Sequence, residues 1–340
     1  MKLEKLLSLC LEKNASDLHL SSGMPPVMRI DGDLVAIDEK PLEPQSIQTM
    51  LDTLMNDDQK QSFATTLECD FALSLQNVSA RFRVNVFKQH RGPAVVFRMI
   101  PQKVLKLGDI NAPEVVKSIL KQKNGLILVT GPTGSGKSTT LAAMIDYLND
   151  TTSGHIISVE DPIEFIHQSR RCLVNQREVK QDTLSFNNAL SAMLREDPDY
   201  ILIGEMRDLE TIRMALTAAE TGHLVFATLH TASAPKTIDR IINVFPGEEQ
   251  SMIRTMLAES LHSVISQRLL KRKSGSGRIA AYEILIANSA IRNLIRENKL
   301  PQIHNTLQTG QNLGMQTMEQ AIQKLGDAGV IETNDARNPR

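Results

Sequence analysis

The stretch GPTGSGKST, residues 131–139, places glycines, a lysine and hydroxyl side chains in the order G-x-x-x-x-G-K-[ST]. Glycines allow the backbone to turn so that its N–H groups point inward at phosphate oxygens. A helix after such a turn directs its positive end at the same charge. An apolar run precedes this stretch and an amphipathic segment follows it, which is the context that the motif needs. We therefore predict a P-loop that binds a nucleotide.

This prediction assigns roles to single residues. Lys137 is expected to contact the β- and γ-phosphates, and Ser138 is expected to ligate Mg²⁺. The residues expected to surround the nucleotide are Gly131, Thr133, Gly134, Ser135, Gly136, Lys137, Ser138 and Thr139.

Three carboxylates follow an apolar run that ends at Val159: Glu160, Asp161 and Glu164, within SVEDPIEF. Carboxylates beside a nucleotide can hold Mg²⁺ or accept a proton from the attacking water. An acidic first turn of a helix would give the same pattern. The residues alone leave these readings open.

Polar residues also follow two later apolar runs. Glu205 comes directly after the run 200–203 and Gly204, where P-loop NTPases carry an acid associated with Mg²⁺. His223 and His230 bracket the run 224–228. We expect both histidines at the ligand-binding edge, as polar sensors of the γ-phosphate, although a structural role fits the residues equally well.

Strand-like runs alternate with helical patterns through this part of the chain, which predicts an α/β fold with a mostly parallel sheet covered by helices. The runs are 126–129, 155–159, 200–203 and 224–228. Ligands of such sheets bind at the carboxyl ends of the strands, so the four polar segments are expected to meet at one edge.

The first hundred residues mix other signals. In ARFRVNVFKQ, apolar residues alternate with Arg81, Arg83 and an asparagine, the period of a half-buried strand. PAVVFRMIP adds a second strand carrying Arg98, and Asp31-Gly32 marks a hairpin turn. With an amphipathic helix at the start, these signals predict a small α+β domain.

The segment 101–113 has a proline at each end and a glycine inside, so it is expected to link two domains as a hinge. The predicted organisation is an N-terminal domain at 1–100, the linker at 101–113, and an ATPase domain with a helical C-terminal region at 114–340.

Composition excludes several classes of protein. The net charge of −1, the absence of tryptophan and an aromatic content of 4% argue against a nucleic-acid binder. Three widely spaced cysteines support neither a disulfide framework nor a zinc site, and are expected to be free buried thiols. No run is long and apolar enough to span a membrane, so a cytoplasmic chain with only peripheral membrane association is expected.

Taken together, GPTGSGKST, SVEDPIEF, ILIGEMRD and TGHLVFATLHT resemble, in order, the Walker A motif, Asp box, Walker B motif and His box of the secretion ATPase superfamily, which drives type II secretion and type IV pili. The resemblance extends over nearly the whole chain, including ASDLHLSSGMPPVMRIDGDL. AIRNLIRE, residues 290–297, is similar to a segment of the pilus retraction (twitching motility) subfamily. Many assembly ATPases of this superfamily carry a paired-cysteine zinc element at the place where this chain reads LLKRKSGSGRIAAYEILI, without cysteine, so the resemblance favours retraction.

The resemblance implies a RecA-like ATPase domain after a PAS-like domain, with ATP and Mg²⁺ as ligands. It implies that Glu164 activates the water, that Glu205 and Ser138 lie at Mg²⁺, and that His230 senses the γ-phosphate. The N-terminal arginines that could complete the site are Arg81, Arg83 and Arg98. Which of them does so is left open.

The implied assembly is a homo-hexamer at the cytoplasmic face of the inner membrane. It would act on a pilus platform protein in that membrane, with an accessory retraction ATPase as a further partner. The alternatives are an assembly or accessory ATPase of a pilus or type II secretion system, a nucleic-acid translocase, and a nucleotide switch with negligible turnover.

Overall fold

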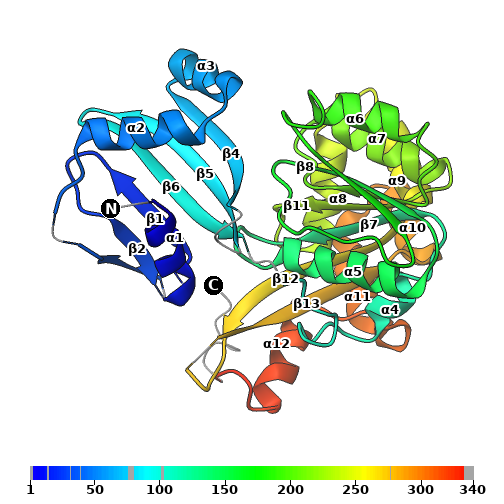
Figure 1. Cartoon of the computed structure of the whole chain (residues 1–340). Helices are drawn as coiled ribbons and strands as arrows, with labels where there is room; N and C mark the ends of the chain where they lie inside the picture. Colours follow the sequence, from blue (N-terminus) through cyan, green and yellow to red (C-terminus); the bar gives the residue numbers. More distant parts are fainter. Residues whose placement is uncertain are drawn as a thin grey trace. The chain divides into compact units, whose positions relative to one another are not determined.

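The computed structural model describes residues 3–13, 15–30, 32–38, 40–75, 80–100, 103–275 and 277–332. The chain divides into two compact units, Met1–Lys103 and Val104–Arg340 (Figure 1). No helix of the described residues is long and apolar enough to cross a membrane.

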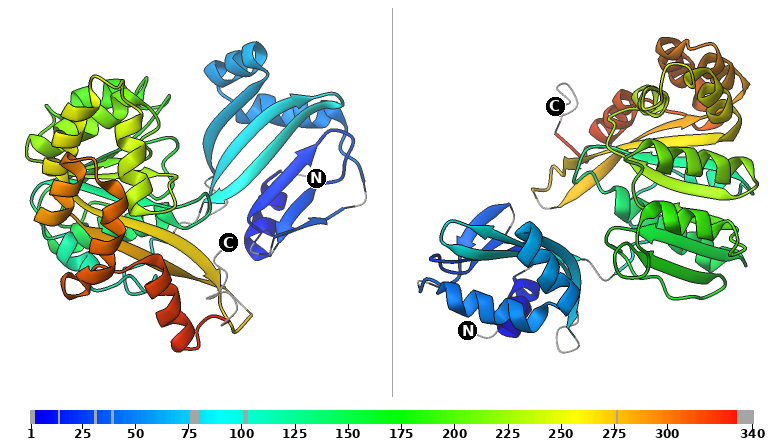
Figure 2. Two further views of the ribbon diagram at one scale, coloured as in Figure 1. Left: turned by 180° about the vertical axis from the view of Figure 1, so that it is seen from behind. Right: turned by 90° about the horizontal axis from the view of Figure 1, so that it is seen from above.

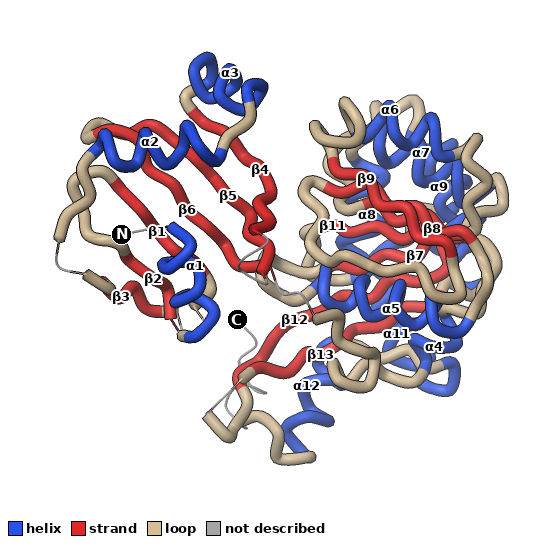
Figure 3. Tube along the Cα trace, in the orientation of Figure 1, coloured by secondary structure: helices blue, strands red, loops and turns tan. Residues whose placement is uncertain are grey.

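The first unit is an antiparallel sheet of six strands, in the order β3-β2-β1-β6-β5-β4, with helices packed against it (Figure 3). Its strands are β1 (Asp17–Ser21), β2 (Val27–Ile30), β3 (Asp33–Ala36), β4 (Glu68–Leu75), β5 (Ala80–Gln89) and β6 (Gly92–Ile100). Its helices are α1 (Leu3–Glu12), α2 (Pro44–Leu54) and α3 (Asp57–Thr66).

Alternation along β5 explains why this sheet has one buried face. Phe82, Val84 and Val86 are buried, whereas the residues between them are exposed or half-buried. Phe82 meets Phe97 of β6 edge to face, with ring centroids 6.5 Å apart. The predicted N-terminal helix and strands are confirmed. β2 and β3 pair as a hairpin, but Asp31 of its predicted turn lies outside the described residues.

The second unit is a seven-stranded sheet, in the order β13-β12-β7-β11-β10-β8-β9. Its neighbours are parallel except for β13, which runs antiparallel to β12. The strands are β7 (Gly125–Thr130), β8 (His155–Glu160), β9 (Leu173–Glu178), β10 (Tyr200–Ile203), β11 (Leu224–Leu229), β12 (Leu261–Lys271) and β13 (Arg278–Ile286).

Helices cover both faces of this sheet (Figure 2). The α-helices are α4 (Val115–Ile119), α5 (Lys137–Thr151), α6 (Phe186–Met193), α7 (Leu209–Glu220), α8 (Ala234–Asn243), α9 (Gln250–Ser260), α10 (Ser289–Arg296), α11 (Ile303–Thr309) and α12 (Met318–Asp327). Short 3-10 segments, η1 (Leu300–Gln302) and η2 (Gly310–Leu313), flank α11.

The central strand β7 shows how the two faces are filled. Leu126 and Leu128 pack into the core cluster shared with α6 to α11, and Ile127 and Val129 pack into the cluster shared with α4 and α5. Successive side chains of a strand point to opposite faces, so a strand covered on both sides must be apolar throughout. This is why the run was recognisable in the sequence.

All four predicted strands of the parallel sheet are confirmed as β7, β8, β10 and β11. The strands β9, β12 and β13 were not predicted. β12 reads LHSVISQRLLK, and its polar residues include Ser263, Ser266 and Gln267, all buried. Polar side chains inside a buried strand break the apolar run on which recognition depends.

The predicted linker at 101–113 packs with the second unit from Val104 on. Leu107 is buried in the cluster of α4 and α5, and the hydroxyl of Tyr282 donates to the carbonyl of Ile110 at 3.1 Å. Pro101 lies outside the described residues.

Candidate nucleotide-binding site

The P-loop lies between β7 and α5, where the sequence placed it. Gly131, Gly134 and Gly136 have φ values of 145°, 76° and 89°, a region that favours glycine. A Cβ atom at Gly131 would lie 2.4 Å from the carbonyl oxygen of Gln267 and 2.6 Å from Oγ of Ser135. The loop therefore keeps its shape only with glycine at its start.

Lys137 is the first residue of α5 and is buried. Its Nζ donates to the carbonyls of Gly131 and Pro132, at 2.9 and 3.1 Å, and lies 3.3 Å from Nδ1 of His230. Burial lowers the pKa of Lys137, and the carboxylates of Glu205 and Glu164 partly oppose that effect. The ammonium is thus held over the loop, pointed at the region where phosphate is expected.

Glu205 follows β10 and is held through both carboxylate oxygens. Its Oε1 lies 3.1 Å from Nε2 of His230, and its Oε2 accepts from Arg207 at 2.7 Å. Burial would raise the pKa of Glu205, but the contacts with Arg207 and His230 outweigh it and hold the pKa below its usual value. Lys137, His230 and Glu205 therefore form one chain of contacts across the ends of β7, β11 and β10.

Parallel pairing explains this meeting point. β11 lies between β7 and β10, and the three strands run in one direction. Their carboxyl ends thus deliver Lys137, His230 and Glu205 to one edge. Arg207 lies two residues after Glu205 in the sequence. Nothing in the local pattern indicated that it binds the carboxylate.

Glu160, at the end of β8, is partly buried. Its carboxylate accepts from Ser158 at 2.8 Å and from Gln176 at 3.3 Å, and the backbone N–H of Glu164 also bonds to it. Burial raises the pKa of Glu160 from 4.5 to about 7, against the effect of these bonds. Asp161 and Glu164, by contrast, have exposed side chains.

A pH-dependent contribution to stability follows from Glu160. Between pH 4.5 and about 7 its native form binds a proton that the unfolded form has lost. The free energy of unfolding contributed by this group therefore falls as the pH rises through that window. Glu160→Gln should remove the fall. We expect urea unfolding at pH 5 to 8 to show that the free energy of unfolding of the wild type, minus that of the variant, decreases as the pH rises. A difference that stays constant over this range would contradict the assignment.

His223 does not lie at the predicted place. It precedes β11, so it is at the opposite end of that strand from His230, and the expectation that both share the ligand edge is wrong for His223. A six-residue strand separates them by about 20 Å. Nδ1 of His223 lies 2.9 Å from the carbonyl oxygen of Ala218, and its own carbonyl accepts from the N–H of Gly125. These contacts are structural.

The side chains at this edge could supply only some of the ligands of a Mg²⁺ ion. Among the described residues, no group of three or more His, Cys, Asp or Glu side chains could hold a metal ion. In P-loop proteins the ion takes ligands from a hydroxyl and from the phosphates. Ser138 is half-buried at the start of α5. The Oγ of Ser135 is buried and has no hydrogen-bond partner among the described residues.

The predicted N-terminal arginines share one face of the first unit's sheet. Arg83 of β5 stands directly opposite Arg98 of β6, and Arg81 is two residues from Arg83. Nε of Arg98 donates to the buried carboxylate of Asp17 at 2.8 Å, whereas Arg83 lies 3.9 Å from Asp70. Arg98 is thus the most firmly oriented of the pair, although its side chain remains 66% exposed.

The segment AIRNLIRE forms α10, with the predicted apolar face turned inward. Ile291 and Ile295 are fully buried, and Leu294 packs against the same core cluster. Arg292 donates to the carbonyls of Ala287 and of the last turn of α9, and Arg296 pairs with Glu259 at 2.9 Å. The helix is therefore an integral part of the second unit. All three cysteines are buried and none forms a disulfide bond, as predicted.

Comparisons with known proteins agree with this arrangement. A family model described as "Type II/IV secretion system protein" matches residues 1–335. The chain is 57% identical over 337 residues to the type IV pilus retractation ATPase PilT of Pseudomonas aeruginosa, covering 99% of this chain and 97% of the relative. It is 58% identical over 312 residues to a twitching motility protein of Neisseria gonorrhoeae, covering 92% and 83%.

A solved structure of the pilus retraction motor PilT with bound ADP matches with a TM-score of 0.91 and 47% identity, covering 99% of this chain and 96% of that one. Fold, motifs and full-length similarity thus point the same way. The chain belongs to the type II/IV secretion system protein family, and within it to the pilus retraction ATPases.

Proposed function

We propose that this chain is a motor that hydrolyses ATP to retract type IV pili. The observation that carries the proposal is the contact chain Lys137–His230–Glu205 at the end of a P-loop sheet. A full-length likeness to a retraction ATPase supports it. Retraction means that pilus subunits return from the fibre, so the machine must couple each hydrolysis event to a change of shape.

The site residues divide the chemistry among them. Lys137 neutralises charge on the β- and γ-phosphates, and the loop N–H groups orient them. Glu164 accepts the proton of the attacking water, since its carboxylate is exposed and its backbone is held by Glu160. His230 bridges Lys137 and Glu205, so it can report phosphate arrival to the acid.

Mg²⁺ would be held by Ser138 and Glu205, where it would neutralise charge that develops on the phosphates. Both oxygens of Glu205 already have partners, so direct ligation would replace one of them. The carboxylate stays ionised near neutral pH because its pKa lies below the usual value. It is thus ready to act on a cation directly or through water.

The working assembly is a homo-hexamer at the cytoplasmic face of the inner membrane, in which arginines complete a neighbour's site. The candidates remain Arg81, Arg83 and Arg98. Such an arginine stabilises transition-state charge and contributes about 10³-fold or more to the rate. The ring would act on a platform protein of the pilus machine, together with an accessory retraction ATPase. The linker at 101–113 would serve as the hinge between the two units.

The test uses a bacterium that extends type IV pili but lacks its own retraction ATPase. The chain is expected to restore twitching and to reduce surface pili, and the Lys137→Ala variant is expected to do neither. In solution, ATPase rate per chain should rise as a hexamer-sized species appears by light scattering. Pili restored in an assembly-deficient strain, with no effect on retraction, would favour an assembly ATPase instead. Tight, salt-dependent DNA binding would favour a translocase.

A further inference from the structure

The loop between β8 and β9, residues 161–172, carries Glu164 but has no helix or strand of its own. Ile163 and Phe165 are buried on either side of Glu164, whose side chain is exposed. A base must be held within a few tenths of an ångström of its working position. The contacts that fix this loop therefore bear directly on the rate of hydrolysis.

The first half of the loop is bonded to side chains of β9. Gln176 donates from Nε2 to the carbonyl of Phe165 at 2.8 Å, and its Oε1 accepts from the N–H of His167 at 2.7 Å. The N–H of Ile163 donates to Glu178 at 3.1 Å. These bonds tie the loop to the sheet edge on one side only.

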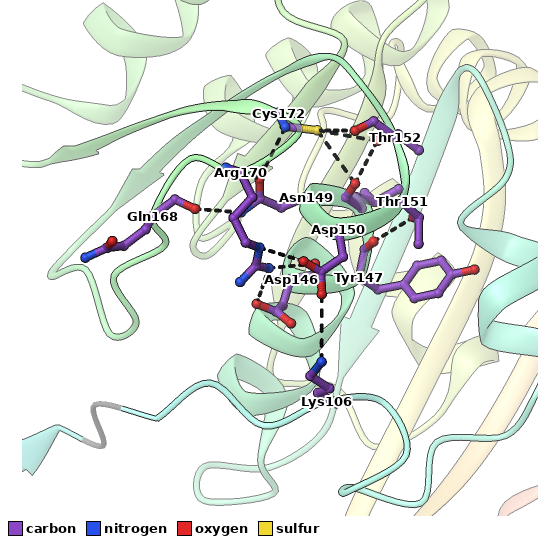
Figure 4. A network of polar contacts seen from close by, with 11 residues as sticks. Lys106, Asp146, Tyr147, Asn149, Asp150, Thr151, Thr152, Gln168, Arg170 and Cys172 are labelled. Atoms are coloured by element: carbon purple, nitrogen blue, oxygen red, sulfur yellow. Dashed lines mark hydrogen bonds and ion pairs between the residues drawn. The ribbon is translucent and has the colours of Figure 1, made fainter.

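The second half is bonded to α5 through Asn149, which is fully buried (Figure 4). Nδ2 of Asn149 donates to the carbonyl of Gln168 at 2.8 Å, and Oδ1 accepts from the N–H groups of Arg170 and Cys172 at 3.0 and 3.3 Å. Its backbone carbonyl accepts from the N–H of Arg171 at 3.1 Å. One asparagine thus bonds to backbone groups of four residues within the stretch 168–172.

Arg170 completes the attachment with its guanidinium. Nη2 donates to Oδ1 of Asp146 at 2.5 Å and to that residue's carbonyl at 3.1 Å, and Nε lies 2.6 Å from Oδ1 of Asp150. Asp146 and Asp150 are one turn apart on the same face of α5. Asp146 is only 7% exposed, so its charge depends on this partner more than a surface carboxylate would.

The helix that receives the loop is the helix that starts the phosphate site. α5 begins at Lys137 and holds the loop through its last two turns, so a rigid element joins the two. We propose that Arg170 and Asn149 are positioning residues for hydrolysis: they hold the Glu164 loop in register with the P-loop helix without touching nucleotide. This inference rests on the proposed function and on Glu164 as the base.

Arg170→Ala is expected to lower kcat by about tenfold, because loosening a support displaces the base by a fraction of an ångström to an ångström. The KM for ATP and the Kd for a fluorescent ATP analogue should stay within about twofold, since the P-loop is unchanged. Arg170→Lys keeps the charge but not the two-pronged geometry and should recover part of the rate. The matched control is Arg171→Ala, whose exposed neighbouring side chain makes no bond among the described residues.

A double-mutant cycle separates positioning from general weakening. If Arg170 acts through Glu164, adding Arg170→Ala to Glu164→Gln should not slow single-turnover hydrolysis further. Additive losses, a change mainly in KM, or an unchanged kcat would overturn the inference. If Glu164→Gln alone hydrolyses ATP normally, the assigned base is wrong and the inference falls with it. Normal kcat in Arg170→Ala beside an inactive Glu164→Gln would overturn the inference and leave the proposed function standing.

Removing Arg170 leaves the carboxylate of Asp146 buried without its partner, which could unfold the chain. Asp146→Asn tests the same contact without that charge. It weakens the bond to Arg170 while keeping the size of the side chain, and a fall in kcat of about threefold is expected, with unchanged KM. Ring size by light scattering and the melting temperature are recorded for every variant. A kcat equal to wild type in Asp146→Asn would count against the inference.

Discussion

Lys137→Ala is expected to lower kcat for ATP by at least about 10³-fold, the largest effect of any single substitution in this chain. Its ammonium is the only cation bonded to the carbonyls of Gly131 and Pro132 among the described residues, and it reaches His230. Phosphoryl transfer depends on charge stabilisation by such groups in a site that excludes water. Alanine would also leave these carbonyls without their donor.

Steady-state hydrolysis with saturating Mg²⁺ measures the loss, and a fluorescent nucleotide measures binding. The matched control is Lys123→Ala, an exposed lysine of the same unit before β7, which should keep the wild-type rate. A Lys137→Ala protein that retains more than about a tenth of the rate would remove the P-loop as the site of hydrolysis.

Glu164→Gln is expected to lower kcat by about 10²-fold or more while ATP still binds, so that the nucleotide stays trapped. A general base contributes typically 10²- to 10⁴-fold, and glutamine keeps the shape of the side chain without its basicity. Single-turnover hydrolysis and retention of labelled ATP after gel filtration measure the two halves of this prediction.

Glu205→Gln is the comparison that distinguishes the two acids. Glu205 is bonded to His230 and Arg207, and its expected role concerns Mg²⁺, so the variant should need more Mg²⁺ for half-maximal rate. If Glu205→Gln abolishes hydrolysis at every Mg²⁺ concentration while Glu164→Gln is normal, the roles are exchanged.

Several elements around the site could be predicted from the sequence. The strands β7, β8, β10 and β11 were predictable because strands buried on both faces are unbroken apolar runs. The P-loop was predictable because its local backbone conformation requires glycine, as the clash of a Cβ atom at Gly131 shows. The inward face of α10 was predictable from its helical period.

Other features depend on which strand neighbours which. His223 and His230 look equivalent in the sequence, but only one follows the carboxyl end of β11. The pairing of β12 with β7 likewise comes from sheet order, which no local pattern encodes.

By itself, therefore, the sequence determined the local chemistry of this protein: the nucleotide loop, the acids that follow buried strands, and the family to which they belong. Only the tertiary structure decided that His230 bridges Lys137 to Glu205, that His223 lies at the far end, and that Arg170 and Asn149 fasten the Glu164 loop to α5. The physical reason is the distance along the sequence over which each kind of interaction acts. Turn geometry and periodicity act over a few residues, whereas these contacts join residues 21 to 93 positions apart, which only the packed sheet brings together.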